Sequence, residues 1–372
     1  MISSTDFIRA FKMNENWMHK ISTPALIVDY KTLQRNITYM ARFAKENKVK
    51  LRPHVKTHKC PLIAHMQLQA GAQGICVAKV SEAEIFAASG IKDILIANEV
   101  ISPEKIDRLL NLNRYTTTMV AVDSRKNIED LNHLARKRDQ ILKVLIDLNV
   151  GLNRTGVQPG EPALALAQLI SQASHLELEG LQAYEGHLTY IKDFAQKKER
   201  TKACMEMAVS TKQLLEENGI ECKTISAGGS GTFMITGKYP GITEIQPGTY
   251  VFNDYHINSV VPDLEIALTI LTTINNKPAK GIFTLDMGSK SISNDMGDPR
   301  FKGYGKKIKV LALTEEHCQC TYPSKYDFNI GDKLEAIPAH VCPTVNLYDF
   351  LYVIQDDEII GRWKIAARGM RE

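Results

Sequence analysis

Eight short apolar runs alternate with segments of helical periodicity between residues 49 and 250, and this alternation constrains the fold more than any other feature. It is typical of βα units that build a parallel sheet. The runs are Val49–Val55, Gly74–Ala78, Ile94–Asn98, Met119–Asp123, Lys143–Leu148, Leu181–Glu185, Lys223–Ala227 and Thr243–Gln246. Helical patterns lie between most of them, at Ser81–Ser89, Pro103–Asn111, Ser124–Arg138, Glu161–Ser174 and Asp193–Asn218. Eight units is the number that closes a (β/α)8 barrel, so we predict an α/β fold of TIM-barrel type.

The chain is longer than one barrel needs, and its character changes after Pro262. With 372 residues it exceeds the roughly 250–300 residues at which single cores stop growing. From Glu265 onward β-rich segments predominate, which predicts a C-terminal β domain. A strand-like run, Pro24–Asp29, and a helical pattern, Lys31–Asn47, precede the first barrel run. We therefore expect an N-terminal segment 1–30 that packs with the β domain, a barrel 31–260 and a β domain 261–372.

Composition excludes several classes of partner. Lys+Arg 46 against Asp+Glu 42 gives a net charge of +4 without a basic block, so neither nucleic acid nor a membrane surface is expected as a partner. Seven cysteines form an odd set without the spacing of a disulfide framework, which indicates a reducing compartment. The first 20 residues lack an apolar signal-peptide core, and no apolar run is long enough to span a membrane. The expected location is the cytoplasm.

Polar residues gather where the first barrel run ends. Alternation in a strand places one set of polar side chains on a single face, namely Lys50, Arg52, His54 and Lys56. A barrel lumen that opens on a ligand accommodates such a face, and neighbouring cations there can make a lysine nucleophilic toward a carbonyl. A solvated edge strand is the alternative that the residues alone leave open.

Two glycine-containing loops follow the seventh and eighth runs, where barrels of this type usually bind phosphate. Gly228-Gly229-Ser230-Gly231-Thr232 lets backbone N–H groups approach an anion, and Gly248-Thr249-Tyr250 follows the next run. A tight turn is the alternative reading. Arg154 follows the fifth run and Tyr184 closes the sixth, and both could contact a heterocyclic ring of a ligand. The alternative is that Arg154 forms a surface ion pair and Tyr184 is an aromatic residue at the rim of the core.

The β-rich part contains a pair of metal-ligand types. His340 and Cys342 are two positions apart and would lie on one side of an extended backbone. With water completing the shell, such a pair would form an open site that suits zinc. A chance arrangement stays possible, because a His-x-Cys pair predicts metal poorly. A rival cluster, Glu315–Cys320, contains two cysteines that share a strand face without His317, and we interpret it as structural.

The motif Arg-Pro-His-Val-Lys-Thr-His-Lys at 52–59 resembles the cofactor-lysine motif of the D-threonine aldolase and D-serine dehydratase family. The resemblance covers nearly the whole chain through the segments at 149–156, 184–187, 228–232, 247–254 and 340–349. It implies an alanine-racemase-like barrel with a β domain, assembled as a head-to-tail homodimer, that binds pyridoxal 5′-phosphate and a divalent metal. By this resemblance Lys56 forms the Schiff base and Arg154 and Tyr184 lie around the pyridine ring. It also assigns a phosphate cup, Gly229, Ser230, Gly231, Thr232, Gly248, Thr249 and Tyr250, and a metal pair, His340 and Cys342.

The resemblance implies a D-3-hydroxy-amino acid as the small-molecule substrate and leaves the reaction open. Retro-aldol cleavage to glycine and an aldehyde is favoured by the context Pro343–Asp349. Dehydration to a 2-oxo acid and ammonia is favoured by Cys342, where aldolases of the family commonly carry aspartate; that aspartate would shift the metal preference from zinc toward manganese or magnesium. An amino-acid racemase would leave the metal pair unexplained. A non-enzymatic cofactor carrier would leave the β domain without a purpose.

Overall fold

The computed structural model describes residues 17–372, which form two compact units. The barrel unit comprises residues 37–250 together with 259–261 and 369–372. The β unit comprises the described residues up to Asn36, together with 251–258 and 262–368. The division thus falls at 36/37 and 250/251, whereas the sequence pattern placed it at 30 and 260. Each unit is described by itself below.

The barrel unit contains an eight-stranded parallel sheet, as the alternation predicted. Its order is β2-β9-β8-β7-β6-β5-β4-β3, so each strand lies beside its neighbour in the chain except at β2. Its strands are β2 (Lys50–Leu51), β3 (Ile75–Val77), β4 (Asp93–Glu99), β5 (Thr117–Val122), β6 (Leu142–Asp147), β7 (Leu176–Ala183), β8 (Thr224–Ala227) and β9 (Glu244–Ile245). An isolated parallel bridge between His54 and Cys76 joins the two ends of this order. The curled sheet of the predicted barrel is therefore confirmed.

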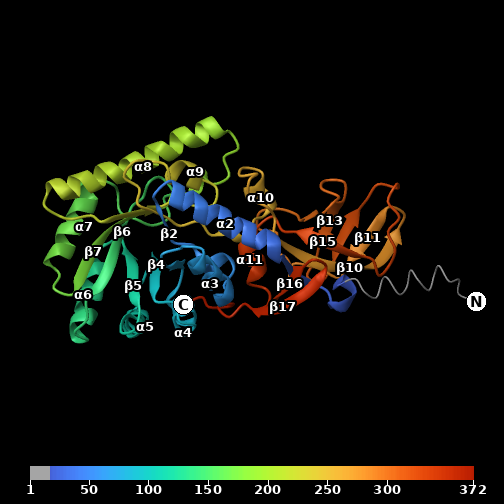
Figure 1. Cartoon of the computed structure of the whole chain (residues 1–372), viewed down its shortest axis with the longest axis horizontal. Coiled ribbons are helices and arrows are strands. Elements are labelled where there is room, and N and C mark those ends of the chain that lie inside the picture. Colours follow the sequence, from blue (N-terminus) through green and yellow to red (C-terminus); the bar gives the residue numbers. More distant parts are fainter. Residues whose placement is uncertain (1–16) are drawn as a thin grey trace, which may run out of the picture. The chain divides into compact units, whose positions relative to one another are not determined.

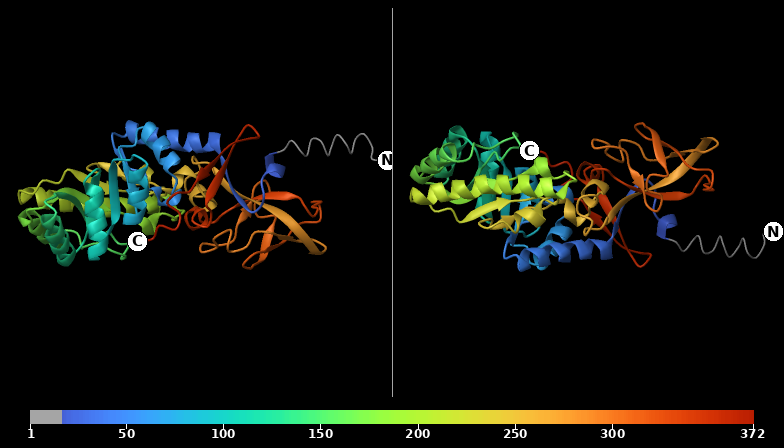
Figure 2. Two further views of the ribbon diagram at one scale, coloured as in Figure 1. Left: turned by 90° about the horizontal axis from the view of Figure 1, so that it is seen from below. Right: turned by 90° about the horizontal axis from the view of Figure 1, so that it is seen from above.

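Helices cover the outside of this curled sheet (Figures 1 and 2). They are the later part of α2 (Tyr30–Glu46), then α3 (Pro61–Gln69), α4 (Val80–Ala88), α5 (Pro103–Asn113), α6 (Arg125–Lys137), α7 (Glu161–Gln172), α8 (Phe194–Glu217) and α9 (Phe233–Thr236). Caps fix two of the starts, because the side chains of Ser124 and Asp193 accept hydrogen bonds from the backbone of the first turns of α6 and α8. Helix α3 was not predicted, because its apolar residues have no marked helical periodicity.

The first strand is much shorter than the apolar run that predicted it. β2 ends at Leu51, and residues Val55–Thr57 form a short 3-10 helix, η2. Lys50 is exposed, whereas Arg52 and His54 are buried. The expectation that four polar side chains share one strand face is therefore wrong, because the strand conformation does not continue to Lys56.

The β unit is built on a nine-stranded, mainly antiparallel sheet. Its principal order is β13-β14-β11-β10-β1-β16-β17, and β15 pairs with both β10 and β12. The strands are β1 (Ala25–Asp29), β10 (Leu268–Ala279), β11 (Ile282–Leu285), β12 (Arg300–Phe301), β13 (Lys309–Leu313), β14 (Cys318–Thr321), β15 (Lys333–Ile337), β16 (Phe350–Gln355) and β17 (Glu358–Lys364). β1 pairs antiparallel with β10 and parallel with β16, so a strand from the start of the chain lies at the centre of this sheet. Two short helices, α10 (Tyr255–Asn258) and α11 (Val341–Val345), belong to the same unit.

Within residues 17–372, no helix combines the length and the apolar character that a bilayer crossing requires.

Candidate functional site

Lys56 lies in η2 at the end of the first barrel strand, half-buried between the buried residues Val55 and Thr57. His54 precedes it and is 9% exposed. Burial lowers the pKa of His54 well below its usual value, and the positive charges of Lys56, Arg154 and Lys59 lower it further. His54 is therefore neutral at pH 7, and its buried Nδ1 has no hydrogen-bond partner among the described residues. This end of the barrel thus combines several cations with an unsatisfied polar atom, which is favourable for an anionic ligand.

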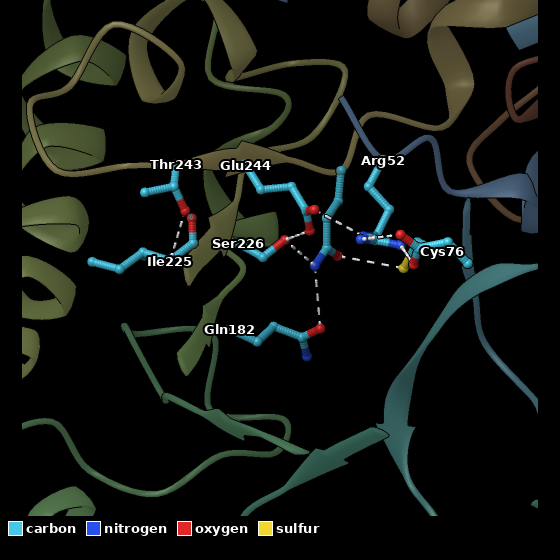
Figure 3. A network of polar contacts seen from close by, with 9 residues as sticks. Arg52, Cys76, Gln182, Ile225, Ser226, Thr243 and Glu244 are labelled. Atoms are coloured by element: carbon cyan, nitrogen blue, oxygen red, sulfur yellow. Dashed lines mark hydrogen bonds and ion pairs between the residues drawn. The ribbon is translucent and has the colours of Figure 1, made fainter. Parts of the chain in front are cut away.

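A polar network fills part of the barrel interior (Figure 3). Arg52 is 2% exposed and forms ion pairs with Asp93 at 2.5 Å and with Glu244 at 2.8 Å. Glu244 also accepts a hydrogen bond of 2.6 Å from Ser226, whose Oγ accepts one of 2.8 Å from Gln246. Because each buried charge has an opposite charge and further polar partners, the network holds three barrel strands and the segment after β2 in a fixed arrangement.

The loop after β8 has the form of an anion cradle. Gly231 lies so close to the carbonyl oxygen of Thr189 that a Cβ there would come within 3.0 Å of it, and Gly228 has a φ of +79°. The backbone N–H groups of Ser230 and Gly231 have no hydrogen-bond partner within residues 17–372. Buried amide donors are rarely left unpaired, so these two fit a ligand with acceptor oxygens.

Side chains from several elements hold this loop. Glu185, which is fully buried, accepts hydrogen bonds from the Gly228 N–H at 3.0 Å and from the Thr236 hydroxyl at 2.5 Å. Within the loop, Thr232 Oγ1 accepts a hydrogen bond of 3.0 Å from the Gly229 N–H. The loop is thus fixed at both of its ends before any ligand binds.

The segment Gly248–Tyr250 lies against both the cradle and the lysine segment. A Cβ on Gly248 would come within 3.0 Å of the His54 carbonyl oxygen, so only glycine fits there. The Tyr250 N–H donates a hydrogen bond of 2.9 Å to Ser230 Oγ. The Tyr250 hydroxyl is buried and instead accepts a hydrogen bond of 2.9 Å from Gln67. Tyr250 therefore supports the cradle through its backbone rather than its hydroxyl group.

Arg154 and Tyr184 form a cation–π pair. The Arg154 guanidinium carbon lies 5.7 Å from the centre of the Tyr184 ring. The Tyr184 ring also borders the glycine loop, because a Cβ on Gly229 would lie 3.1 Å from it. The guanidinium is exposed and the ring is half-buried, so both can face a ligand held by the loop.

A pair of carboxyl groups that was not predicted from the sequence lies at the ends of β4 and β6. The carboxyl groups of Glu99 and Asp147 interact electrostatically, and Gln182 and Thr155 donate hydrogen bonds of 2.8 and 2.9 Å to Asp147. Burial, with the nearby charge of Asp147, raises the pKa of Glu99 to about 7. Burial also raises the pKa of Asp147. Glu99 directly follows the predicted run Ile94–Asn98 and Asp147 lies one residue before the end of the run Lys143–Leu148, so their approximate position was readable from the sequence, but their contact was not.

In the β unit, His340 and Cys342 lie in contact at the start of α11. His340 is extended, but Cys342 is already helical, so the expectation of an extended backbone across the pair is wrong. The Asp295 carboxylate lies 2.7 Å from His340 Nδ1. Although burial lowers it, hydrogen bonding and charge from Cys342 and Asp295 raise the pKa of His340 to about 9. Within residues 17–372 no three His, Cys, Asp or Glu side chains form a preformed metal cluster.

The two cysteines of the rival cluster Glu315–Cys320 belong to the hydrophobic core of the β unit. Cys318 and Cys320 lie on one face of β14 with their sulfur atoms 3.6 Å apart, and both are fully buried. His317 is exposed and does not join them.

Comparison with known proteins places this geometry in a family. Residues 28–256 match the family model "Alanine racemase, N-terminal domain", and residues 267–354 match that of a serine dehydratase domain. The D-threonine aldolase of an Arthrobacter species is 37% identical over 94% of this chain and 93% of its own length. The crystal structure of the D-threonine aldolase of Filomicrobium marinum has a TM-score of 0.91 and 33% identity, covering 94% of this chain and 96% of its own.

A dehydratase is also related. The D-threo-3-hydroxyaspartate dehydratase of Delftia sp. HT23 has a TM-score of 0.84 and 26% identity, covering 93% of this chain and 98% of its own, and a variant of that enzyme has been solved in a metal-free form. The family match spans more than half of the chain, and the first relative covers nearly all of it. The chain therefore belongs to the D-threonine aldolase and D-serine dehydratase family of pyridoxal-phosphate-dependent lyases with an alanine-racemase-like barrel.

Proposed function

We propose that this protein is a pyridoxal-phosphate- and divalent-metal-dependent lyase that cleaves D-3-hydroxy-amino acids to glycine and an aldehyde. The observation that carries the proposal is the pairing, within the barrel unit, of the Lys56 segment with a glycine cradle whose Ser230 and Gly231 N–H groups lack protein partners. A lysine and an anion cradle at one barrel mouth are what a phosphorylated aldehyde cofactor requires.

Different residues of the barrel unit would bind different parts of such a cofactor. Lys56 would hold its aldehyde carbon covalently, and the loop 229–232 with 248–250 would hold its phosphate through backbone N–H groups. Arg154 and Tyr184 would flank its ring. Bound pyridoxal phosphate supplies an electron sink for the bond broken at the substrate Cα.

His340 and Cys342 are the proposed metal ligands. An imidazole and a thiolate suit zinc, with manganese and magnesium as alternatives, and Asp295 on Nδ1 would orient the ring for a metal at Nε2. A bound ion would supply Lewis acidity to the substrate's β-hydroxyl group. Two protein ligands would leave coordination positions of the ion open for a substrate oxygen.

The alternative is dehydration to a 2-oxo acid and ammonia. Cleavage requires a base that takes the β-hydroxyl proton, whereas dehydration requires Lys56 to take the Cα proton before hydroxide leaves. The identity to D-threonine aldolases, 37% and 33%, exceeds that to the dehydratase, 26%, and supports cleavage. Cys342 supports dehydration, because aldolases of the family commonly carry aspartate at this position.

Product analysis after incubation with D-threonine decides between the two reactions. Glycine with acetaldehyde in equal amounts supports the proposal, and 2-oxobutyrate with ammonia supports the alternative. L-threonine serves as the control and should be a poor substrate. Racemisation of alanine without turnover of any D-3-hydroxy-amino acid would contradict both.

A second experiment tests the cofactor. The purified protein should be yellow, and Lys56→Ala should lose the long-wavelength absorbance. Lys50→Ala is the matched control, because Lys50 is an exposed lysine in β2, the strand that precedes η2. A wild type that stays colourless after incubation with pyridoxal phosphate would overturn the proposal. We also expect a homodimer, to be checked by sedimentation.

A further inference from the structure

Lys197 in α8 is a buried cation next to the glycine cradle. Its side chain reaches from the helix to the loop, where Nζ donates hydrogen bonds to the carbonyl oxygens of Thr189 at 3.0 Å and Gly231 at 3.1 Å. The residue is only 3% exposed, although its neighbours in the first turn of α8 face solvent. Lysine is almost never this deeply buried unless its charge is paired.

Among the described residues, this ammonium group has no anionic partner. Within residues 17–372, no carboxylate lies within ion-pair distance of Lys197. Burial alone lowers its pKa to about 8, so it is still mainly charged at pH 7. A buried charge without an opposite charge is costly, and an anion bound nearby would remove much of that cost.

Lys197 also determines the shape of the cradle. The Gly231 and Thr189 carbonyl oxygens both point at Nζ, and without a donor between them two such dipoles would repel one another. Gly231 is the residue whose absent Cβ permits the close approach to Thr189. The same Gly231 carries one of the two N–H groups without a protein partner. The ammonium group therefore fixes the Gly231–Thr232 peptide, which adjoins the Ser230–Gly231 peptide that presents this donor.

We propose that Lys197 is a positioning residue for the phosphate group of the cofactor: it holds Gly231 against Thr189 and adds a buried positive charge behind the cradle. The inference rests on the proposed function, since it requires that the loop binds a phosphate. It predicts that Lys197 contributes to binding of the phosphate and not to binding of the pyridine ring.

The test compares two ligands that differ only in the phosphate group. Apoenzyme is titrated with pyridoxal 5′-phosphate and, separately, with pyridoxal, in wild type, Lys197→Met and Lys197→Arg. In Lys197→Met the Kd for pyridoxal 5′-phosphate should rise about tenfold or more, while the Kd for pyridoxal changes less than about twofold. Lys197→Arg, which keeps the charge, should recover most of the affinity. Lys198→Met, at the exposed next position, is the matched control and should bind as wild type does.

The outcomes separate this inference from the proposed function. Equal Kd values for pyridoxal 5′-phosphate in Lys197→Met and Lys198→Met, or equal weakening of both ligands, would overturn the role of Lys197 alone. A wild type that binds neither ligand would overturn the proposed function and this inference with it. If Lys197→Met does not fold, Lys197→Gln replaces it, because glutamine keeps a donor for one of the two carbonyl oxygens. Its Kd values for pyridoxal 5′-phosphate and pyridoxal are then compared in the same way. Protection of wild-type apoenzyme against heat by inorganic phosphate, lost in Lys197→Gln, supports the inference, and its retention there contradicts it.

Discussion

The Glu185 carboxylate accepts a hydrogen bond of 3.0 Å from the backbone N–H of Gly228, at the point where β8 passes into the glycine cradle. Glu185 follows β7 and is fully buried, and its second oxygen accepts from Thr236 on the far side of the cradle. One side chain thus ties both ends of the loop to the neighbouring strand, and it can do so only as a double acceptor.

Glu185→Gln should loosen the cradle, because the amide keeps only one acceptor oxygen, so either the Gly228 N–H or the Thr236 hydroxyl loses its acceptor. A buried unsatisfied donor costs about 1–3 kcal/mol, so the free energy of unfolding should fall by about that amount. The affinity for pyridoxal 5′-phosphate should fall as well. Urea unfolding and cofactor titration measure the two effects. Glu217→Gln, at the exposed end of α8, is the control, and an effect of equal size there would contradict the prediction.

Arg52→Met should destabilise the barrel unit strongly. The change leaves Glu244, whose side chain is 3% exposed, without its cationic partner, and a broken buried pair costs about 3–5 kcal/mol. The double variant Arg52→Met with Glu244→Gln should regain part of that loss, because the more deeply buried carboxylate is removed and the remaining one, Asp93, is 28% exposed. Urea unfolding of the single and double variants checks this. Arg42→Met removes a surface ion pair with Glu46 and should cost at most about 1 kcal/mol.

Cys342→Asp should change which metal supports activity. A carboxylate is a harder ligand than a thiolate, so the preference should move from zinc toward manganese or magnesium. The yellow colour of the cofactor should remain, since Lys56 is unchanged. Activity after chelation and readdition of single metals, with metal content measured in parallel, tests this. An unchanged metal preference would exclude Cys342 as a ligand.

Glu99 should make stability depend on pH between about 4.5 and 7. Burial raises the folded-state pKa of Glu99 to about 7 from an ordinary value of 4.5, so the folded protein binds more protons there than the unfolded chain. Its favourable contribution is complete below 4.5 and is lost as the pH rises through 7. In Glu99→Gln, the free energy of unfolding relative to wild type should therefore increase with pH across that window. A difference that stays constant with pH would show that Glu99 titrates normally.

Local patterns determined much of this protein. Strand and helix periodicity depends on residues a few positions apart, so the eight βα units, the change to β structure after Pro262 and the glycine loop after β8 could all be predicted. The motif around Lys56 and the pair His340 and Cys342 could be singled out by residue type and spacing, and their expected roles came from the family resemblance.

The tertiary structure decided which distant residues complete these sites. Lys197 lies 34 positions before Gly231, Glu185 lies 43 before Gly228, and Asp295 lies 45 before His340, and no periodic pattern links the members of these pairs. It also decided that β1 enters the sheet of the β unit and that the first barrel strand ends at Leu51. Such contacts depend on how whole elements pack, because burying polar groups requires partners that only the folded chain brings within hydrogen-bond distance.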